Sequence, residues 1–239
     1  MAAAGFETSQ PGTALSCWTE LLAHRARWLF PLQVRALQRL VVVAPHPDDE
    51  TLGAGGLIHT WIQHQRPVTA VSVTDGEASN PTRRDLADVR QRELQRALAM
   101  LGGPSITRVR LGLPDGRVRR WTRSLRTLLR PLFSESVIVA PFERDGHPDH
   151  EAVGRVCCRL AAAQATVLAR YPIWAWHQAE PQRFIDYEWL RFPLSMAARR
   201  VKKRAIHCFE SQLGGPQRSA ILPGHVLEYF AQPEEAFVL

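Results

Sequence analysis

Residues 40–50 read LVVVAPHPDDE. The first five residues are apolar and mostly β-branched, and Pro45 ends the run, which is typical of a strand buried on both faces. Such strands occur in parallel sheets that carry helices on both sides. We therefore expect a strand over residues 40–44, followed by a helix over about 51–65.

The alternation of short apolar runs and helical patterns continues along the chain. Strands that alternate with helices of this length form βαβ units, whose strands are parallel. The sequence therefore predicts a Rossmann-like, three-layer α/β/α fold with a mostly parallel sheet. Further strands are predicted at 68–73, 106–111, 137–140 and 166–170, and further helices at 84–101, 121–133, 151–163 and 195–212.

The N-terminal part of the chain has a different pattern. Apolar residues recur at helical spacing from about residue 17 to residue 40, which predicts a helix on the outside of the domain. We expect a single domain over residues 1–239, with an N-terminal helical extension at about residues 1–39.

The stretch 171–193 is rich in Trp and Pro and has no firm period, apart from a strand pattern near 184–190. Its tryptophans Trp174, Trp176 and Trp189 have two interpretations. They are either platforms on which a sugar ring stacks or members of the core.

The composition, with 45% hydrophobic and 22% charged residues among 239, is typical of a soluble globular protein. Basic residues outnumber acidic ones by 30 to 23, which gives a formal net charge of +7. The arginines are scattered and not interleaved with aromatic residues, so we expect no nucleic-acid groove. Three groups, Arg83–Arg84, Arg117–Arg123 and Arg199–Arg204, remain candidates for contacting an anionic part of a substrate.

Several other classes of protein are not indicated. The four cysteines form no C-x-x-C pair, which argues against a zinc ribbon or a redox motif. No apolar stretch is long enough to span a bilayer, and no secretory signal begins the chain, so we expect a cytoplasmic protein without a transmembrane segment. The glycines of residues 53–56 lie too far beyond the strand for a dinucleotide loop and predict close helix packing instead.

Two clusters of His and Asp residues follow predicted strands. Pro45–Glu50 follows the first strand, and Asp145–His150 follows the strand at 137–140. Either cluster alone has a second interpretation, as a solvated turn or the start of a helix. Because the carboxyl ends of parallel strands meet at one edge of a sheet, we expect the two clusters to lie together.

Imidazole and carboxylate groups are common zinc ligands, and catalytic zinc sites use three protein ligands and leave one position open for water. His46, Asp49 and His150 supply such a set. We therefore expect one Zn²⁺ per chain, although the same ligands accept other divalent metals.

The chain resembles the PIG-L/LmbE deacetylases over about residues 40–213. The resemblance rests on residues 45–50 and 147–150, which match that family's two metal motifs without substitution. It extends to Thr74–Glu77, Arg90 and Glu93, Leu113–Gly116 and Ser211–Gln212. Members of this family remove acetyl groups from N-acetylglucosamine-containing lipids, thiols and antibiotics.

The resemblance implies a role for each matching position. It makes His46, Asp49 and His150 the zinc ligands and Asp48 the general base. The resemblance also implies that His147 faces the reacting carbonyl and that Asp149 orients His147. Arg90 and Asp115 would bind the sugar. For Arg90 an ordinary surface ion pair with Glu93 is the alternative.

Together with the metal motifs, this resemblance implies a zinc-dependent hydrolase that removes an N-acetyl group from a small-molecule or glycan substrate of the GlcNAc type. A related amidase that cleaves a larger acyl group or a sugar-thiol conjugate is the first alternative. A basic, non-catalytic metal-binding module is the second, although a structural zinc site would require four ligands and only three are supplied.

Overall fold

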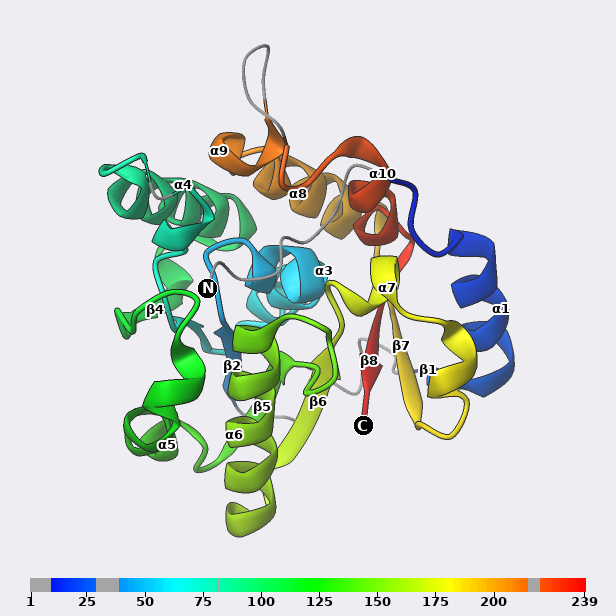
Figure 1. Cartoon of the computed structure of the whole chain (residues 1–239). Helices are drawn as coiled ribbons and strands as arrows, with labels where there is room; N and C mark the ends of the chain where they lie inside the picture. Colours follow the sequence, from blue (N-terminus) through cyan, green and yellow to red (C-terminus); the bar gives the residue numbers. More distant parts are fainter. Residues whose placement is uncertain (1–9, 29–38, 81, 215–219) are drawn as a thin grey trace.

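The structure is a computed structural model that describes residues 10–28, 39–80, 82–214 and 220–239. These residues form an eight-stranded sheet in the order β1-β7-β8-β6-β5-β2-β3-β4 (Figure 1). All neighbouring strands are parallel except where β8 pairs with β6 and β7. The predicted mostly parallel α/β sheet is confirmed. The strands are β1 (Ala26–Trp28), β2 (Arg39–Ala44), β3 (Val68–Ser72), β4 (Ile106–Arg110), β5 (Ser136–Pro141), β6 (Val167–Tyr171), β7 (Trp189–Pro193) and β8 (Glu234–Val238).

The order of the central strands determines where a ligand can bind. From β2 the chain passes outward through β3 to β4, and then returns to the other side of β2 to form β5 and β6. This reversal creates a crevice at the carboxyl ends of β2 and β5, the usual location of a site in an open α/β sheet. Both His and Asp clusters follow these two strands.

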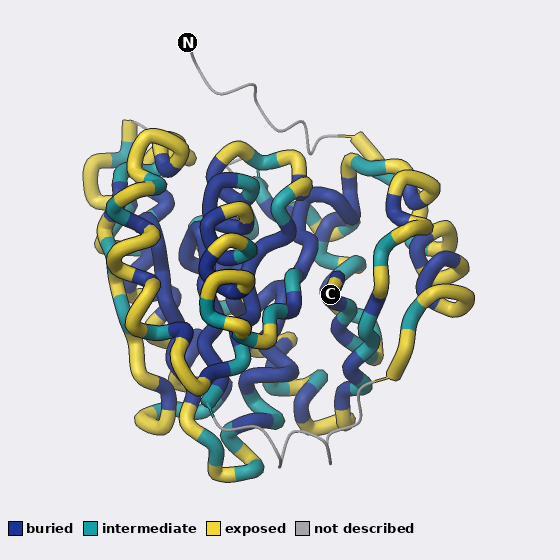
Figure 2. The backbone as a smooth tube through the Cα atoms, turned by 90° about the horizontal axis from the view of Figure 1, so that it is seen from below, coloured by how far each residue is buried: buried dark blue, intermediate teal, exposed yellow. Residues whose placement is uncertain are grey.

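Two hydrophobic cores cover the two faces of the sheet, and β2 contributes to both. Leu40 and Val42 pack in the core with α3 (Asp49–Gln63) and α4 (Leu86–Leu101). Val41 and Val43 pack in the other core with α5 (Thr122–Leu129) and α6 (Pro148–Gln164). Figure 2 shows this arrangement as a buried centre inside a shell of exposed helical surface. The remaining helices are α1 (Leu15–Arg25), α7 (Ala175–Gln178), α8 (Met196–Ile206), α9 (Glu210–Leu213) and α10 (Gly224–Leu227).

The glycines of α3 serve close packing, as predicted. A Cβ atom on Gly53 would lie 2.4 Å from the ring of Tyr171, and one on Gly56 would lie 2.3 Å from Leu194. The helix is interrupted at Ala54, whose φ of −143° and ψ of 15° are not helical. The segment after this kink therefore has its own N-terminus, whose N–H groups need acceptors.

Three predictions at the margins of the fold need correction. The predicted helix over 17–40 is helical only to Arg25, because Ala26–Trp28 pair with β7 as a strand; residues 29–38 lie outside the described residues. The last helix ends at Ile206 and restarts as α9. The strand predicted near 184–190 is a 3-10 turn over Pro181–Phe184 followed by β7.

The tryptophans of the 171–193 stretch belong to the core. Trp174, Trp176 and Trp189 are all at least 92% buried, so the interpretation as sugar platforms does not apply to them. In the described residues, no helix is long and apolar enough to cross a membrane.

Candidate active site

Three side chains at the carboxyl edge of the sheet bring their ligand atoms together. His46 lies just after β2, Asp49 is the first residue of α3, and His150 is in the first turn of α6. Nδ1 of His46 is 3.2 Å from Nε2 of His150, and each nitrogen is 3.3 Å from Oδ2 of Asp49. All three residues are at least 91% buried.

These distances fit a tetrahedral zinc ion. Zinc bonds of about 2.0–2.1 Å keep tetrahedral ligand atoms about 3.3 Å apart, which agrees with the separations among His46, Asp49 and His150. Other acidic and imidazole side chains lie near these three residues. Two further groups could therefore hold a metal ion: His46 with His147 and His150, and His46 with Asp115 and Asp149.

Each of the two histidines has a carboxylate on its second ring nitrogen. Nε2 of His46 is 2.9 Å from Oδ1 of Asp115, and Nδ1 of His150 is 2.8 Å from Oδ2 of Asp145. Carboxylates in this position fix the tautomer and orientation of a metal-binding imidazole. Burial lowers the pKa of His150, but Asp49 and Asp145 outweigh burial and raise that pKa to about 9. The cluster therefore favours a positive charge, either a proton or a cation.

Asp145 is a site residue to which the sequence assigned no role. Its carboxylate also accepts hydrogen bonds from the backbone N–H groups of Ile173, Trp174 and Ala175 at 2.7–3.1 Å. It thereby joins His150 to the segment that follows β6. Its position within the acidic cluster Asp145–His150 was the available signal, but nothing in the sequence identified its partner.

Asp48 has a strained backbone, with φ of 142°. Residues other than glycine rarely occupy this region, and such strain is concentrated at functional sites. The carboxylate of Asp48 accepts a hydrogen bond of 2.8 Å from Arg90. Burial raises the pKa of Asp48 to about 7, with Arg90 opposing the rise and Asp49 adding to it.

Arg90 lies buried at the carboxyl edge of the sheet and not on the helix surface. Its guanidinium group donates to the carbonyl groups of Gly76 and Pro47, at 3.1 and 2.8 Å, as well as to Asp48. The alternative of a surface ion pair with Glu93 is therefore wrong. Glu93 instead accepts hydrogen bonds from the backbone N–H and hydroxyl groups of Ser211.

His147 and Asp149 are connected through the main chain. The backbone N–H of Asp149 donates to Nδ1 of His147 at 3.2 Å, so the proton of a neutral His147 ring lies on Nε2. The carboxylate of Asp149 accepts hydrogen bonds from the N–H groups of Gly116 and Val118 at 2.7 and 3.1 Å. Burial and the charges of His150 and His46 lower the pKa of His147 to about 2.

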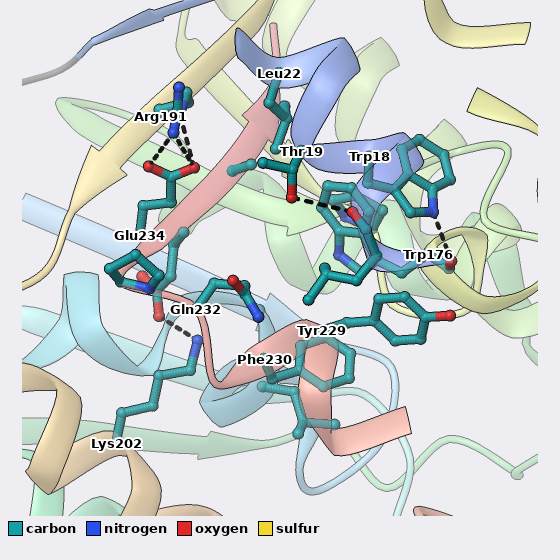
Figure 3. A pocket seen from close by; sticks show the side chains of 17 residues that line it. Trp18, Thr19, Leu22, Trp176, Arg191, Lys202, Tyr229, Phe230, Gln232 and Glu234 are labelled. Atoms are coloured by element: carbon teal, nitrogen blue, oxygen red, sulfur yellow. Dashed lines mark hydrogen bonds and ion pairs between the residues drawn. The ribbon is translucent and has the colours of Figure 1, made fainter. Parts of the chain in front are cut away.

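A pocket of about 120 Å³ lies on another side of α3, lined mainly by apolar groups that include Trp18, Trp176 and Phe230. Its charged residues pair with one another: Arg191 with Glu234, and Lys202 with Glu235 (Figure 3). None of the residues at the carboxyl edge described above lines it. The charged groups of this pocket are thus already paired, and the pocket lies apart from the histidine cluster.

The chain is similar to a known family and to curated and solved proteins. The family model described as PIG-L, GlcNAc-PI de-N-acetylase, matches residues 41–161, which include every ligand candidate. A curated relative from Bacillus anthracis, a probable N-acetyl-alpha-D-glucosaminyl L-malate deacetylase 2, is 32% identical over 146 residues. The match covers 54% of this chain and 61% of that relative, so the chain spans less than two thirds of its length.

Solved structures share the fold. The conserved protein TT1542 from Thermus thermophilus has a TM-score of 0.57 and 26% identity, over 84% of this chain and 93% of that one. The N,N'-diacetylchitobiose deacetylase from Pyrococcus horikoshii, solved with an inhibitor, has a TM-score of 0.58 and 18% identity, over 84% of each chain. The second likeness concerns the fold alone.

Proposed function

The chain belongs to the PIG-L family, and from that premise we propose that it is a metal-dependent hydrolase that removes the N-acetyl group of a GlcNAc-type amino sugar conjugate. The observation that carries the proposal is the triangle of ligand atoms from His46, Asp49 and His150, with sides of 3.2–3.3 Å. Three protein ligands leave a coordination position open, which favours catalysis over a structural role.

We infer that the resident ion is zinc and that these three residues hold it. Asp115 and Asp145 would orient the rings of His46 and His150. When bound, zinc polarises a carbonyl group and lowers the pKa of a water molecule to about 7. Other divalent ions are compatible with the same donors.

In this proposal Asp48 accepts the proton of the attacking water and later delivers it to the amine nitrogen. Its pKa, which burial raises to about 7, suits a group that must first take and then give a proton near neutral pH. The hydrogen bond from Arg90 holds the carboxylate in place. Contact between the sugar and Arg90 or Asp115 remains a prediction.

His147 is proposed to stabilise the negative charge that develops on the carbonyl oxygen. A neutral ring whose Nδ1 accepts the Asp149 amide hydrogen can donate through Nε2. Asp149 then acts as a positioning residue, because it binds the loop at Gly116 and Val118 and directs the His147 ring through its own N–H group.

The test combines metal content with amine release. We expect wild type and Asp48→Asn to bind about one zinc ion per chain, and only the wild type to release free amine from N-acetylglucosamine-bearing substrates. Asp186→Asn, at an exposed position, is the matched control and should retain activity. Absence of metal from the wild type would overturn the proposal, whereas bound metal without amine release would favour the non-catalytic metal-binding module. Full activity of Asp48→Asn would remove Asp48 from the mechanism.

A series of substrates with different acyl groups distinguishes an N-deacetylase from the first alternative, an amidase for larger acyl groups. N-propionyl and longer N-acyl analogues of the same sugar should react more slowly than the N-acetyl compound. A preference for the longer acyl groups would instead identify an amidase with the same metal chemistry.

A further inference from the structure

The pocket of about 120 Å³ lies between the N-terminal helix α1 and the C-terminal part of the chain. Figure 3 shows α1 above this pocket and the 3-10 turn Glu228–Phe230, which carries Tyr229 and Phe230, below it. Leu52 of α3 and Lys202 of α8 also line it. Protein interiors rarely keep voids larger than a water molecule, so a space of this size where several elements meet is a candidate binding site.

Four of the described residues that line the pocket are charged, and their charges cancel in pairs. Arg191 donates two hydrogen bonds of 2.7 and 2.6 Å to Glu234. Nζ of Lys202 lies 2.7 Å from Glu235, and both of these residues are at least 96% buried. A charged ligand would lose its water without gaining an unpaired counter-charge from these side chains, which is unfavourable. The pocket therefore favours a neutral molecule.

The apolar part of the lining contains four aromatic side chains, Trp18, Trp176, Tyr229 and Phe230. In Figure 3, Arg191, Glu234 and Lys202 lie to the left of the pocket, and the rings of Trp18 and Tyr229 lie to the right. Pairs of aromatic rings attract one another in edge-to-face and offset arrangements more strongly than their buried area alone provides. The lining therefore favours a ligand that itself carries an aromatic ring.

The hydrogen-bond donors beside these rings already have acceptors in the protein. The indole N–H of Trp18 donates to the carbonyl of Trp176 at 2.7 Å, and the hydroxyl of Tyr229 donates to the carbonyl of Thr13. The hydroxyl of Thr19 donates to the carbonyl of Leu15 at 3.0 Å. A buried water molecule needs two to four polar partners, so water is held weakly here and an apolar group can displace it.

The size of the pocket limits the ligand to about one ring. An engineered apolar cavity of about 150 Å³ takes up benzene, and this pocket of about 120 Å³ has in addition an opening to solvent at the exposed residue Thr19. A six-membered ring therefore fits inside, with a small substituent at the opening.

The pocket is separate from the candidate active site. Leu52 and Gly53 of α3 line it, but Asp49 at the start of that helix does not. Pro172 also lines it and directly precedes Ile173, whose N–H group binds Asp145. An occupant would thus be a second ligand, distinct from an acetylated sugar at the carboxyl edge of the sheet.

We propose that this pocket binds a neutral molecule that carries a single aromatic ring. The ring packs among the four aromatic side chains, and the paired charges of Arg191, Lys202, Glu234 and Glu235 exclude ionised ligands. Binding does not depend on the proposed hydrolysis, and its test needs no activity measurement.

The test is isothermal titration calorimetry of the full chain with four ligands of similar size. We expect benzyl alcohol to bind, and benzoate and benzylammonium to bind at least about 10-fold more weakly, because each brings a charge that finds no partner. Cyclohexylmethanol, which lacks the aromatic ring, should bind about 2- to 10-fold more weakly than benzyl alcohol. The proposal is overturned if benzyl alcohol does not bind, or if the charged or the non-aromatic ligands bind equally well.

Variants of α1 locate the binding to this pocket. Thr19→Trp places a large side chain at the opening and should lower the affinity for benzyl alcohol by about 10- to 100-fold. Thr19→Leu should lower it by a smaller factor. The matched control is Glu20→Trp, at the next residue of the helix, which is exposed and does not line the pocket.

Glu20→Trp should bind benzyl alcohol as the wild type does, and melting curves should show that all three variants are folded. An unchanged affinity in Thr19→Trp would place the binding elsewhere and overturn the proposal. Displacement of benzyl alcohol by N-acetylglucosamine would also overturn it, because the pocket would then be part of the sugar site.

Discussion

Asp145 shows how a single side chain can connect a proposed metal ligand to the rest of the fold. Its carboxylate accepts three backbone N–H groups after β6 and lies 2.8 Å from Nδ1 of His150. Buried carboxylates in such positions restrict the imidazole to one tautomer and one orientation. The ligand geometry at His150 therefore depends on a residue that need not touch the metal.

We expect Asp145→Asn to weaken metal binding by about 10- to 100-fold, because the amide presents an N–H₂ group where the carboxylate accepts hydrogen bonds. Competition with a chelator of known affinity measures the change. Asp115→Asn should act in the same direction through His46, whereas Asp186→Asn should not. An unchanged zinc affinity in Asp145→Asn would show that His150 is oriented by its own backbone.

At the level of the element, the kink in α3 has a specific partner. The N–H groups of Gly56 and Leu57, freed by the kink at Ala54, donate to the carboxylate of Glu235 at 2.7 and 2.8 Å. Lys202 of α8 lies 2.7 Å from the same carboxylate, and both charged residues are at least 96% buried. Strand β8 thus caps the segment of α3 that follows the kink.

Glu235→Ala should lower the free energy of unfolding by about 3–5 kcal/mol, because it leaves the buried Lys202 charge and two N–H groups without an acceptor. Glu235→Gln keeps one acceptor and should lower the free energy of unfolding by a smaller amount. Urea denaturation measures both. Glu234→Ala is the control, because it breaks a more exposed ion pair with Arg191. An equal decrease in the free energy of unfolding in this variant would contradict the capping role of Glu235.

The element scale also shows what the sequence can and cannot predict. Strands such as β2 are apolar and β-branched because helices cover both faces, and that pattern is local. Strand β8, with the sequence EEAFV, was not predicted because its first two residues are charged. Glu235 is buried because it contacts α3 and α8, which the sequence pattern does not show. The His and Asp motifs identified the candidate ligands, but the partners of Arg90 and Asp145 depend on contacts between distant segments.

The N-terminal segment is joined to the domain by Trp18 of α1. The indole is 1% exposed, donates to the carbonyl of Trp176 at 2.7 Å and packs edge-on against that ring at 4.9 Å. Trp18→Ala should therefore destabilise the whole domain by about 3–5 kcal/mol. Trp121→Ala, at an exposed ring, is the control, and urea denaturation compares the two. A loss below about 1 kcal/mol for Trp18→Ala would show that α1 is a separable appendage.

For the molecule as a whole, the carboxyl edge concentrates buried negative charge. Asp48, Asp49, Asp145 and Asp149 are all at least 94% buried around two histidines. Like charges in such an environment repel one another at a large cost unless protons or a cation neutralise them. The stability of the whole chain should thus depend on the occupancy of the metal site.

We expect removal of the metal with a chelator to lower the melting temperature by about 5–10 °C relative to protein in zinc at 100 times the dissociation constant, since that excess contributes about 2.7 kcal/mol. Differential scanning calorimetry measures the shift, and readdition of zinc should restore it. His150→Ala should lose the zinc-dependent shift, whereas Asp48→Asn should keep it because Asp48 is proposed as the base and not as a ligand. If the melting temperature of the wild type were the same with and without zinc, the histidine cluster would not be a metal site, and the proposed chemistry would lose its basis.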